Sequence, residues 1–264
     1  MELAFAKYQG TGNDFVVIDD RAGVWEPRLD RAAVARLCDR RFGIGGDGLI
    51  LLCEAPGYDF RMKYFNADGG ESTLCGNGAR CLTAFARRQG IVRAHYTFLA
   101  IDGPHHSYCD DGLVHLQMLA PQGYRAFGPD RHWIDTGSPH LVCLADTPVA
   151  ALDVQRQGSD LRYDSQWAAS GGTNVNFVNR IDAHSLRMRT YERGVEAETL
   201  SCGTGAVACA YVHYLLEDRQ PRHIVLHTPG GNLGVQIEVV DGEEKVWLTG
   251  PAVFVFEGHT DLPQ

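Results

Sequence analysis

Short runs in which hydrophobic residues alternate with polar ones, or dominate, recur along most of the chain. Runs of about four to eight such residues, separated by Gly, Pro and Asp turns, are typical of β-strands. The pattern predicts strands at 3–8, 14–19, 48–53, 60–65, 95–101, 112–119, 174–179, 185–191, 223–228, 234–240 and 244–248. A further strand-like run, VFVFEG, follows Pro251.

Two stretches show helical spacing instead. The first, GARCLTAFARRQG, follows Cys75 and places Leu82 and Phe85 on one face, with Gly90 as a C-cap. The second, AVACAYVHYLLEDRQP, follows Cys202 and opens with turns that are apolar on every side, which is typical of a fully buried helix. A strand-rich chain with one such helix in each half predicts an α+β fold, in which each mostly antiparallel sheet wraps around a central helix.

The same two stretches belong to an internal repeat. YFNADGGESTLCGNGA (64–79) aligns with YERGVEAETLSCGTGA (191–206) so that Cys75 meets Cys202. The other identical pairs are Tyr64 with Tyr191, Glu71 with Glu198, Gly76 with Gly203, Gly78 with Gly205 and Ala79 with Ala206, while Asn66 meets Arg193. A repeat separated by about half the chain indicates a duplicated domain rather than a short-period solenoid.

The repeat predicts two domains, 1–120 and 121–250, each carrying one Cys-Gly-x-Gly element. The segment PQGYRAFGPD at 121–130 shows no periodicity and contains two prolines, so we expect it to be the linker. We expect the strand-like end of the chain, 251–264, to return to the first domain.

The charge and hydropathy of the chain exclude several classes of protein. A formal net charge of −9 argues against a nucleic-acid partner, which would need a basic surface. No window approaches the roughly 18 apolar residues of a membrane span, and the first residues do not resemble a signal peptide. We therefore expect a cytoplasmic protein that acts on a small molecule, without a membrane partner.

The cysteine and lysine positions narrow the chemistry further. The chain has 8 cysteines but no Cys-x-x-Cys pair, so we expect free thiols, and the spacing argues against the alternative of a metal-binding or redox-sensing thiol protein. Lysine occurs only at Lys7, Lys63 and Lys245, each in or beside a strand-like run. A pyridoxal-phosphate racemase needs a lysine for its Schiff base, so we expect no cofactor and no metal.

Cys75 and Cys202 suit one reaction in particular. Inverting the α-carbon of an amino acid requires a base on one face and an acid on the other, and a thiolate and a thiol can fill these roles near neutral pH. Each cysteine directly precedes a helix, whose first N–H groups attract anions. We therefore expect Gly76-Asn77 and Gly203-Thr204 to hold the substrate carboxylate, and to stabilise the charge that develops on it.

Six segments resemble the diaminopimelate epimerase family, in the same order and over nearly the whole chain. They are KYQGTGNDFVVID (7–19), FGIGGDGLILL (42–52), YFNADGGESTLCGNGARC (64–81), DTGSPHLV (135–142), GGTNVNFV (171–178) and YERGVEAETLSCGTGAVA (191–208). The resemblance implies two pseudo-symmetric domains, an active site in the cleft between them that closes on substrate, and a homodimer. It also implies an isomerase that interconverts LL- and meso-diaminopimelate, in the synthesis of lysine and of cell-wall precursors.

The resemblance assigns roles to further residues. It implies that His140 and Glu192 support catalysis by Cys75 and Cys202. Substrate-binding positions match Asn13, Asn66, Gly76, Asn77, Asn174, Glu192, Arg193, Gly203 and Thr204. The alternative is a related two-thiol racemase acting on another amino acid, such as histidine or proline. Such a substrate lacks a second carboxylate and would leave Arg193 unpaired, which favours diaminopimelate.

Two positions depart from the family pattern. Many members have Gly-Asn-Pro-His where this chain has Gly137-Ser138-Pro139-His140, and some carry glutamine in place of Gly48. Neither change touches the thiols. Both bear on contacts with the distal end of the substrate.

Overall fold

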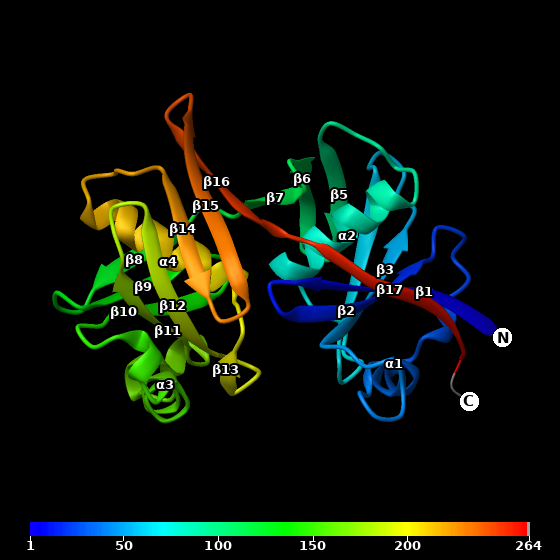
Figure 1. Cartoon of the computed structure of the whole chain (residues 1–264), viewed down its shortest axis with the longest axis horizontal. Helices are drawn as coiled ribbons and strands as arrows, with labels where there is room; N and C mark the ends of the chain where they lie inside the picture. The colour runs from blue at the N-terminus through cyan, green and yellow to red at the C-terminus, as the bar shows by residue number, and fades with distance from the viewer. Residues whose placement is uncertain (263–264) are drawn as a thin grey trace. The chain divides into compact units, whose positions relative to one another are not determined.

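The computed structural model describes residues 1–262 and divides into two compact units. The first unit comprises Met1–Leu116 and the segment that begins at Gly250, and the second comprises Gln117–Thr249 (Figure 1). Each unit contains its own series of paired strands and two α-helices. No helix within residues 1–262 has the length and apolar character needed to cross a bilayer.

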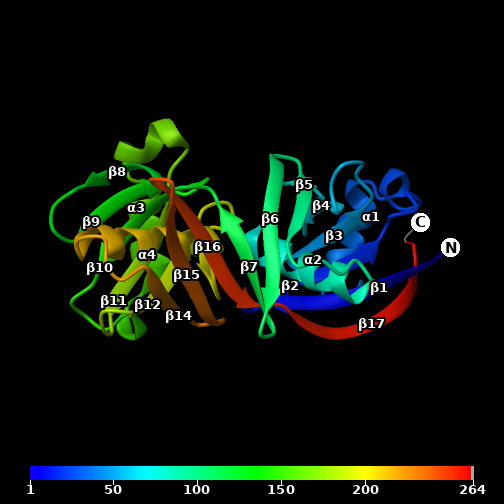
Figure 2. The same ribbon diagram turned by 90° about the horizontal axis from the view of Figure 1, so that it is seen from above.

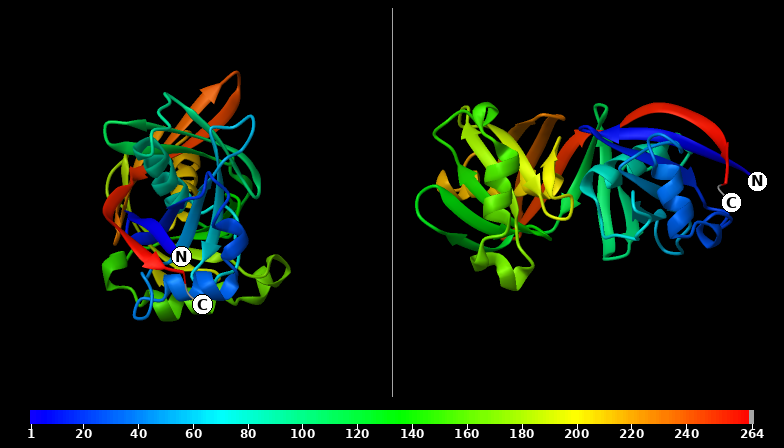
Figure 3. Two further views of the ribbon diagram at one scale, coloured as in Figure 1. Left: turned by 90° about the vertical axis from the view of Figure 1, so that its right-hand side faces the viewer. Right: turned by 90° about the horizontal axis from the view of Figure 1, so that it is seen from below.

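The sheet of the first unit is built from both ends of the chain. Its strands are β1 (Glu2–Gly10), β2 (Asn13–Asp19), β3 (Gly48–Cys53), β4 (Phe60–Asn66), β5 (Tyr96–Ala100), β6 (Gly103–Asp110), β7 (Leu113–Met118) and β17 (Val253–Asp261). The helices are α1 (Arg31–Cys38) and α2 (Gly76–Arg88), with a 3-10 turn η1 (Glu26–Arg28). Strand β17 runs antiparallel along β1, as Figures 2 and 3 show.

The second unit has the same kinds of element. Its strands are β8 (Gln122–Ala126), β9 (Arg131–Asp135), β10 (Pro139–Leu144), β11 (Asn174–Arg180), β12 (Ser185–Glu192), β13 (Ala197–Thr199), β14 (His223–Thr228), β15 (Gly231–Val240) and β16 (Glu243–Pro251). The helices are α3 (Val154–Arg162) and α4 (Gly203–Leu216), with 3-10 turns η2 (Val149–Ala151) and η3 (Ser165–Ser170).

The two sheets pair their strands in the same sequence of directions. From β1 through β2, β3, β4, β5 and β6, the pairs are antiparallel, parallel, antiparallel, parallel and antiparallel. From β9 through β10, β11, β12, β14 and β15, the directions follow in the same order. The helix that begins after a cysteine lies between β4 and β5 in one unit and after β13, before β14, in the other. The expectation of a duplicated α+β fold is confirmed.

Helices cover both faces of the first sheet at β3. All six residues of β3 are buried. Leu49 and Leu51 pack in a core that includes Val34 and Leu37 of α1, whereas Ile50 faces α2. A strand buried on both faces reads as a continuous apolar run, which is the pattern of the sequence GLILLC.

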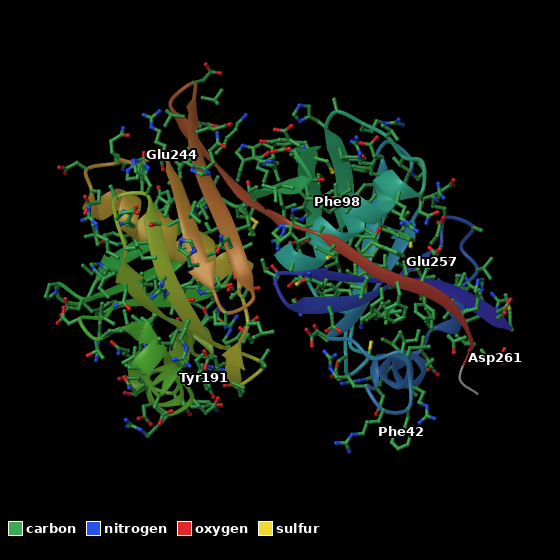
Figure 4. The ribbon with its side chains drawn as sticks, viewed as in Figure 1. Phe42, Phe98, Tyr191, Glu244, Glu257 and Asp261 are labelled. Carbon is green, nitrogen blue, oxygen red and sulfur yellow. The ribbon has the colours of Figure 1, made fainter. Side chains whose placement is uncertain are left out.

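The helix that follows Cys202 is buried on nearly every side, as its sequence predicts. Gly203 and every residue from Gly205 to Tyr214 are buried. Tyr214 donates a hydrogen bond of 3.0 Å to Glu244, a residue of β16 that is labelled in Figure 4. The helix that follows Cys75 buries the residues from Asn77 to Thr83, together with Phe85 and Ala86.

Every predicted strand corresponds to an observed one, and the segment after Pro251 forms β17. The expectation of an irregular linker at 121–130 is wrong, because β8 occupies Gln122–Ala126 and pairs with β9. All five residues of β8 are exposed. A strand without a buried face lacks the alternation of hydrophobic and polar residues from which strands are predicted.

Candidate active site

Cys75 is the N-cap residue of α2 and has an extended backbone conformation. Its thiol is half-buried, and its Sγ donates to Asn13 Oδ1 over 3.7 Å. Asn77 Nδ2 donates to the same oxygen over 3.4 Å. The side chain of Cys75 makes no capping hydrogen bond to α2, so the start of the helix lacks the side-chain cap that most helices have.

The orientation of Asn13 is fixed from behind by a group of charged residues. Its Nδ2 donates to Asp47, which leaves Oδ1 for Cys75 and Asn77. Arg40 bridges Asp47 at 2.8 Å and Asp14 at 2.6 Å, and Lys7 lies 2.8 Å from Asp14.

The same charges govern the titration of Asp14. Burial raises its pKa, but the hydrogen bonds from Arg40 and Lys7 outweigh burial and lower the pKa to about 2. The carboxylate therefore stays ionised near neutral pH. The turn that presents Asn13 is thus braced by fixed charges rather than by packing alone.

Cys202 occupies the equivalent place at the start of α4. It is 6% exposed, and its side chain likewise makes no capping hydrogen bond. Its Sγ lies 3.4 Å from Thr204 Oγ1, which in turn lies 3.0 Å from His140 Nε2. Three side chains from α4 and β10 therefore form one continuous chain of contacts.

The hydrogen bonds around His140 determine its tautomer. Asn176 Nδ2 lies 3.2 Å from the carbonyl oxygen of Leu141, which identifies this atom as the amide donor. The same Nδ2 lies 3.1 Å from His140 Nδ1, so Nδ1 accepts and the ring carries its proton on Nε2. The Nε2–H of His140 therefore faces two oxygens at 3.0 Å, Thr204 Oγ1 and Ser138 Oγ, and the hydroxyl of Thr204 can donate to Cys202.

His140 is neutral at physiological pH. It is fully buried, and burial together with the positive charge of Arg193 lowers its pKa to about 3, although the hydrogen bond from Asn176 opposes this shift. A neutral imidazole in this tautomer can stabilise a negative sulfur through the Thr204 hydroxyl without itself carrying charge.

Asn174, Glu192 and Arg193 gather at the ends of β11 and β12. Asn174 Oδ1 accepts a hydrogen bond of 2.8 Å from the backbone N–H of Arg193, and its Nδ2 donates to Pro139 O at 2.9 Å. Thr199 donates to Glu192 Oε2 at 2.9 Å. These contacts fix the backbone next to Arg193 and one oxygen of Glu192.

The two departures from the family pattern have structural explanations. Ser138 Oγ lies 3.0 Å from His140 Nε2 and accepts from Asn174 Nδ2 at 3.1 Å, so this hydroxyl belongs to the hydrogen-bond network of His140. A Cβ at Gly48 would lie 2.5 Å from the carbonyl oxygen of Phe65 and 2.6 Å from the ring of Tyr64. Residue 48 has no room for a side chain here.

Asn66 lies at the end of β4, where it is exposed, and its backbone N–H donates to Gly70 O at 2.9 Å. In the first unit the structure thus brings Asn13 and Asn77 to Cys75. In the second it brings Thr204 and His140 to Cys202. The sequence reasoning missed Asp47 and Asn176, which orient Asn13 and His140, because neither residue type stands out from its segment.

The remaining cysteines are poor candidates for chemistry. Burial raises the pKa of Cys38, Cys53, Cys81 and Cys143 to about 12, and raises the pKa of Cys109 and Cys209 as well. Such thiols stay protonated and unreactive near neutral pH. They act as small apolar side chains.

Asp20, Glu26 and Cys53 bring ligand atoms within 4.8 Å of one another, as a metal site would. These atoms are already engaged: Asp20 accepts the backbone N–H groups of Trp25 and Glu26, and Glu26 pairs with Arg61 and Lys63. Two cations beside the group oppose the binding of a third.

Comparison with solved structures identifies the fold. A phenazine biosynthesis protein of the PhzF family from Bacillus anthracis superposes with a TM-score of 0.77 at 16% identity, covering 98% of this chain and 99% of that one. A probable proline racemase from Agrobacterium radiobacter gives a TM-score of 0.67 at 15% identity, covering 99% of this chain and 93% of that one. Identities this low establish a shared two-domain fold and nothing about substrate.

Comparison with other sequences is more specific. A diaminopimelate epimerase from Flavobacterium psychrophilum is 44% identical over 254 residues, covering 95% of this chain and 97% of that protein. One from Chlorobaculum tepidum is 39% identical over 260 residues, covering 96% and 99%. The family model for diaminopimelate epimerase matches residues 5–110 and 132–255. With its duplicated sheets and a cysteine at the start of one helix in each, the chain belongs to the diaminopimelate epimerase family.

Proposed function

We propose that this chain interconverts LL- and meso-diaminopimelate by moving a proton at one α-carbon, and so supplies precursors of lysine and peptidoglycan. One observation carries the proposal: each unit starts a helix at a cysteine that does not cap it, on a chain that matches the diaminopimelate epimerase family over nearly its full length. The reaction needs two groups of this kind and no others to move the proton.

The uncapped helix starts are the site of the reacting carboxylate. Helices α1 and α3 are capped by Asp30 and Asp153, which accept backbone N–H bonds of 2.8 and 3.1 Å. Helices α2 and α4 lack such caps. The backbones of Gly76-Asn77 and Gly203-Thr204 are therefore suited to bind a carboxylate, and to stabilise the extra charge it acquires when the α-proton leaves.

The proton moves in two balanced halves. The thiolate of one cysteine takes the α-proton and becomes a thiol, while the electron pair left behind delocalises into the carboxylate. The thiol of the other cysteine then gives its proton to the opposite face and becomes the thiolate. The enzyme ends each turnover with the two protonation states exchanged, and solvent restores them.

The distal end of the substrate meets residues of both units. Arg193 offers a planar pair of donors for the second carboxylate, and Glu192 offers an acceptor for an ammonium group. Asn13, Asn66 and Asn174 supply further polar contacts. For this to happen, the two units must present Cys75 and Cys202 to one cleft that closes on substrate, and we include that cleft, and a homodimer in the cytoplasm, in the proposal.

A two-thiol racemase for histidine or proline remains the alternative within the same fold. Such substrates carry one carboxylate, and Arg193 would then face no anion. Incubation of the purified protein with LL-diaminopimelate, L-histidine or L-proline, without added cofactor, followed by chiral chromatography, tests the choice. We expect inversion of diaminopimelate alone. Inversion of either other amino acid at a comparable rate would refute the assignment of substrate.

A further inference from the structure

Arg162, the last residue of α3, is buried against the loop that leads into β11. Its side chain is 11% exposed, and its Nη1 donates to Gly171 O over 2.9 Å. A Cβ on Gly172 would lie 1.4 Å from the same nitrogen, so the guanidinium packs directly against the backbone of that glycine. Gly172 has a left-handed φ of 87°, which favours glycine. One end of the guanidinium therefore fixes this loop.

The other end of the guanidinium reaches the turn between β12 and β13. Arg162 Nη2 donates to Glu196 Oε1 over 3.0 Å. The same oxygen accepts the backbone N–H of Gly194 at 3.0 Å, and Tyr163 donates to Oε2 at 2.9 Å. Burial raises the pKa of Glu196, but these hydrogen bonds outweigh burial and lower it, so the carboxylate is ionised at neutral pH. One buried ion pair thus joins the loop before β11 to the turn after β12.

Glu196 has a backbone conformation that a glutamate rarely adopts. Its φ is 58°, in the left-handed region, which is uncommon for a residue other than glycine. At the matching position of the repeat the first unit has Gly69, with φ of 80°. Glycine would fit the turn at a lower cost. A glutamate at such a position indicates that its side chain has a role, and the contacts of its carboxylate are those with Arg162, Tyr163 and the turn itself.

Arg193 belongs to this turn and also lies against the loop. The backbone N–H of Glu196 donates to Glu192 O at 2.9 Å and closes the turn around Arg193. The backbone N–H of Arg193 donates to Asn174 Oδ1 at 2.8 Å. A Cβ on Gly171 would lie 3.9 Å from Arg193 Nη1, so the guanidinium of Arg193 runs beside the loop. Both segments that the ion pair joins therefore border the side chain of Arg193.

We infer that Arg162 and Glu196 are a positioning pair, which holds the side chain of Arg193 where it can bind the distal carboxylate of the substrate. This role rests on the proposed function, in which Arg193 binds that carboxylate. The pair acts through Arg193 and not on the reacting carbon. Fixing the loop and the turn in advance reduces the conformational entropy that Arg193 loses when substrate binds.

The first unit supplies the contrast. There Asn66 aligns with Arg193, and its short side chain has less freedom to lose. The ion pair beside the matching turn joins Arg31 of α1 to Asp68, and these side chains are 71% and 60% exposed. An exposed pair of this kind contributes little to order. The buried pair thus occurs in the unit whose turn carries the long cationic side chain.

Steady-state kinetics with diaminopimelate test the inference. Arg162→Met and Glu196→Gly should each raise KM about tenfold and change kcat less than about twofold, because a displaced Arg193 weakens binding at the end of the substrate that does not react. Glu196→Gly removes the carboxylate but relieves the left-handed strain, so it should change the urea midpoint little. Arg156→Met, which removes an exposed charge from the same helix, is the control and should leave KM and kcat unchanged.

A double-mutant cycle shows whether the pair acts through Arg193. In a chain that already carries Arg193→Lys, Glu196→Gly should change kcat/KM by less than about twofold, because the guanidinium that Glu196 helps to position is absent. If Glu196→Gly causes its full loss in that background as well, or lowers kcat with KM unchanged, the inference is wrong.

Hydrogen exchange of the substrate-free chain gives a readout that does not depend on activity. The backbone amide of Arg193, which donates to Asn174, should exchange about tenfold faster in Glu196→Gly, while the amides of α4 keep their native rates. A native rate at Arg193, or an unchanged KM in a variant of a chain that epimerises diaminopimelate, would overturn the inference alone. A native chain that does not epimerise diaminopimelate would instead overturn the proposed function, and this role of Arg193 with it.

Discussion

Cys75 and Cys202 begin equivalent helices in two units with the same strand directions, yet the groups that surround them differ. Near Cys75 lie residues of charged type: the buried Arg80 in the helix that follows it, and Asp14 and Asp47, which belong to the group that holds Asn13 in place. Behind Cys202 lie neutral hydrogen bonds that run from Thr204 to His140. The two units share the arrangement of the backbone around the cysteine but differ in the side chains that surround it.

This difference suits a reaction that needs one thiol and one thiolate. Two identical surroundings would give both sulfurs the same affinity for a proton, and half of the resting molecules would have the pair the wrong way round for a given substrate. The sulfur of Cys75 donates to an amide oxygen, whereas the sulfur of Cys202 lies beside a hydroxyl that can donate to it, and this difference removes that symmetry.

The largest expected effect comes from removing either sulfur. Cys75→Ala and Cys202→Ala should each lower the rate of epimerisation by about a thousandfold or more, because each direction of the reaction needs both a base and an acid. Circular dichroism of the two variants should match that of the native chain. Substantial inversion by either variant would contradict the two-base mechanism.

Proton exchange sharpens the same comparison. In heavy water, the meso product formed from LL-diaminopimelate should carry deuterium at the inverted carbon from the first turnovers, because its new hydrogen comes from a thiol that has exchanged with solvent. The remaining LL substrate should stay largely unlabelled at early times. A product that keeps the hydrogen of its substrate would point to a single base that serves both faces.

The next largest effect concerns Arg193, where the two copies of the repeat differ because Arg193 aligns with Asn66. Arg193→Lys should lower kcat/KM for diaminopimelate about a hundredfold, because lysine keeps the charge but cannot grip a carboxylate with two parallel hydrogen bonds. Arg187→Lys, on the exposed face of β12, is the control. An unchanged kcat/KM would show that Arg193 does not bind the distal carboxylate.

Elements whose burial leaves a pattern in the sequence were predictable. The two helices that follow the cysteines and most strands with a buried face were predicted, but β9 and β10 were missed although each buries hydrophobic residues. Strand β6 was missed because the residues it buries include polar His105 and Ser107. Helix α3 was missed because Gly158 lies in its interior, where a Cβ would come within 2.3 Å of Tyr191. The close contact with Tyr191 requires glycine at this position, although glycine disfavours a helix.

The candidate site divides in the same way. Cys75, Cys202 and their glycines were predicted from the repeat, and His140 and Arg193 from the family resemblance. The partners that orient them were not, because contacts such as Asn13 with Asp47 join residues far apart in the sequence.

A pair of glycine substitutions tests how rigid the two supports are. A Cβ at Gly205 would lie 2.5 Å from Asn176 Oδ1, whereas one at Gly78 would meet the terminal methyl of Ile50 at 3.0 Å. Asn176 cannot move without losing its bonds to His140 and Thr190, but the end of an isoleucine can.

We therefore expect Gly205→Ala to lower the free energy of unfolding by about 2 to 3 kcal/mol and to reduce kcat, and Gly78→Ala to cost about 1 kcal/mol or less. Urea denaturation and steady-state kinetics measure both effects. Equal losses for the two variants would show that the hydrogen-bond network of His140 is no more rigid than the apolar packing beneath α2.

The smallest expected effect is the loss of folding stability at acidic pH that His140 and Asp14 cause. His140 has a pKa near 3 in the folded chain against 6.5 in the unfolded one, so the unfolded chain binds the extra proton between these values and stability falls as the pH drops below 6.5. At pH 5 the loss should be about 1 to 2 kcal/mol. Asp14 behaves differently, because its pKa falls from 3.8 to about 2 on folding, and its contribution is lost only below 3.8.

Urea midpoints at pH 7 and pH 5 should therefore differ less for His140→Asn than for the native chain, whereas Asp14→Asn should lower the midpoint equally at both values. If His140→Asn keeps the full acid sensitivity of the native chain, the imidazole is not held neutral, and the contrast between a charged support for Cys75 and a neutral one for Cys202 fails.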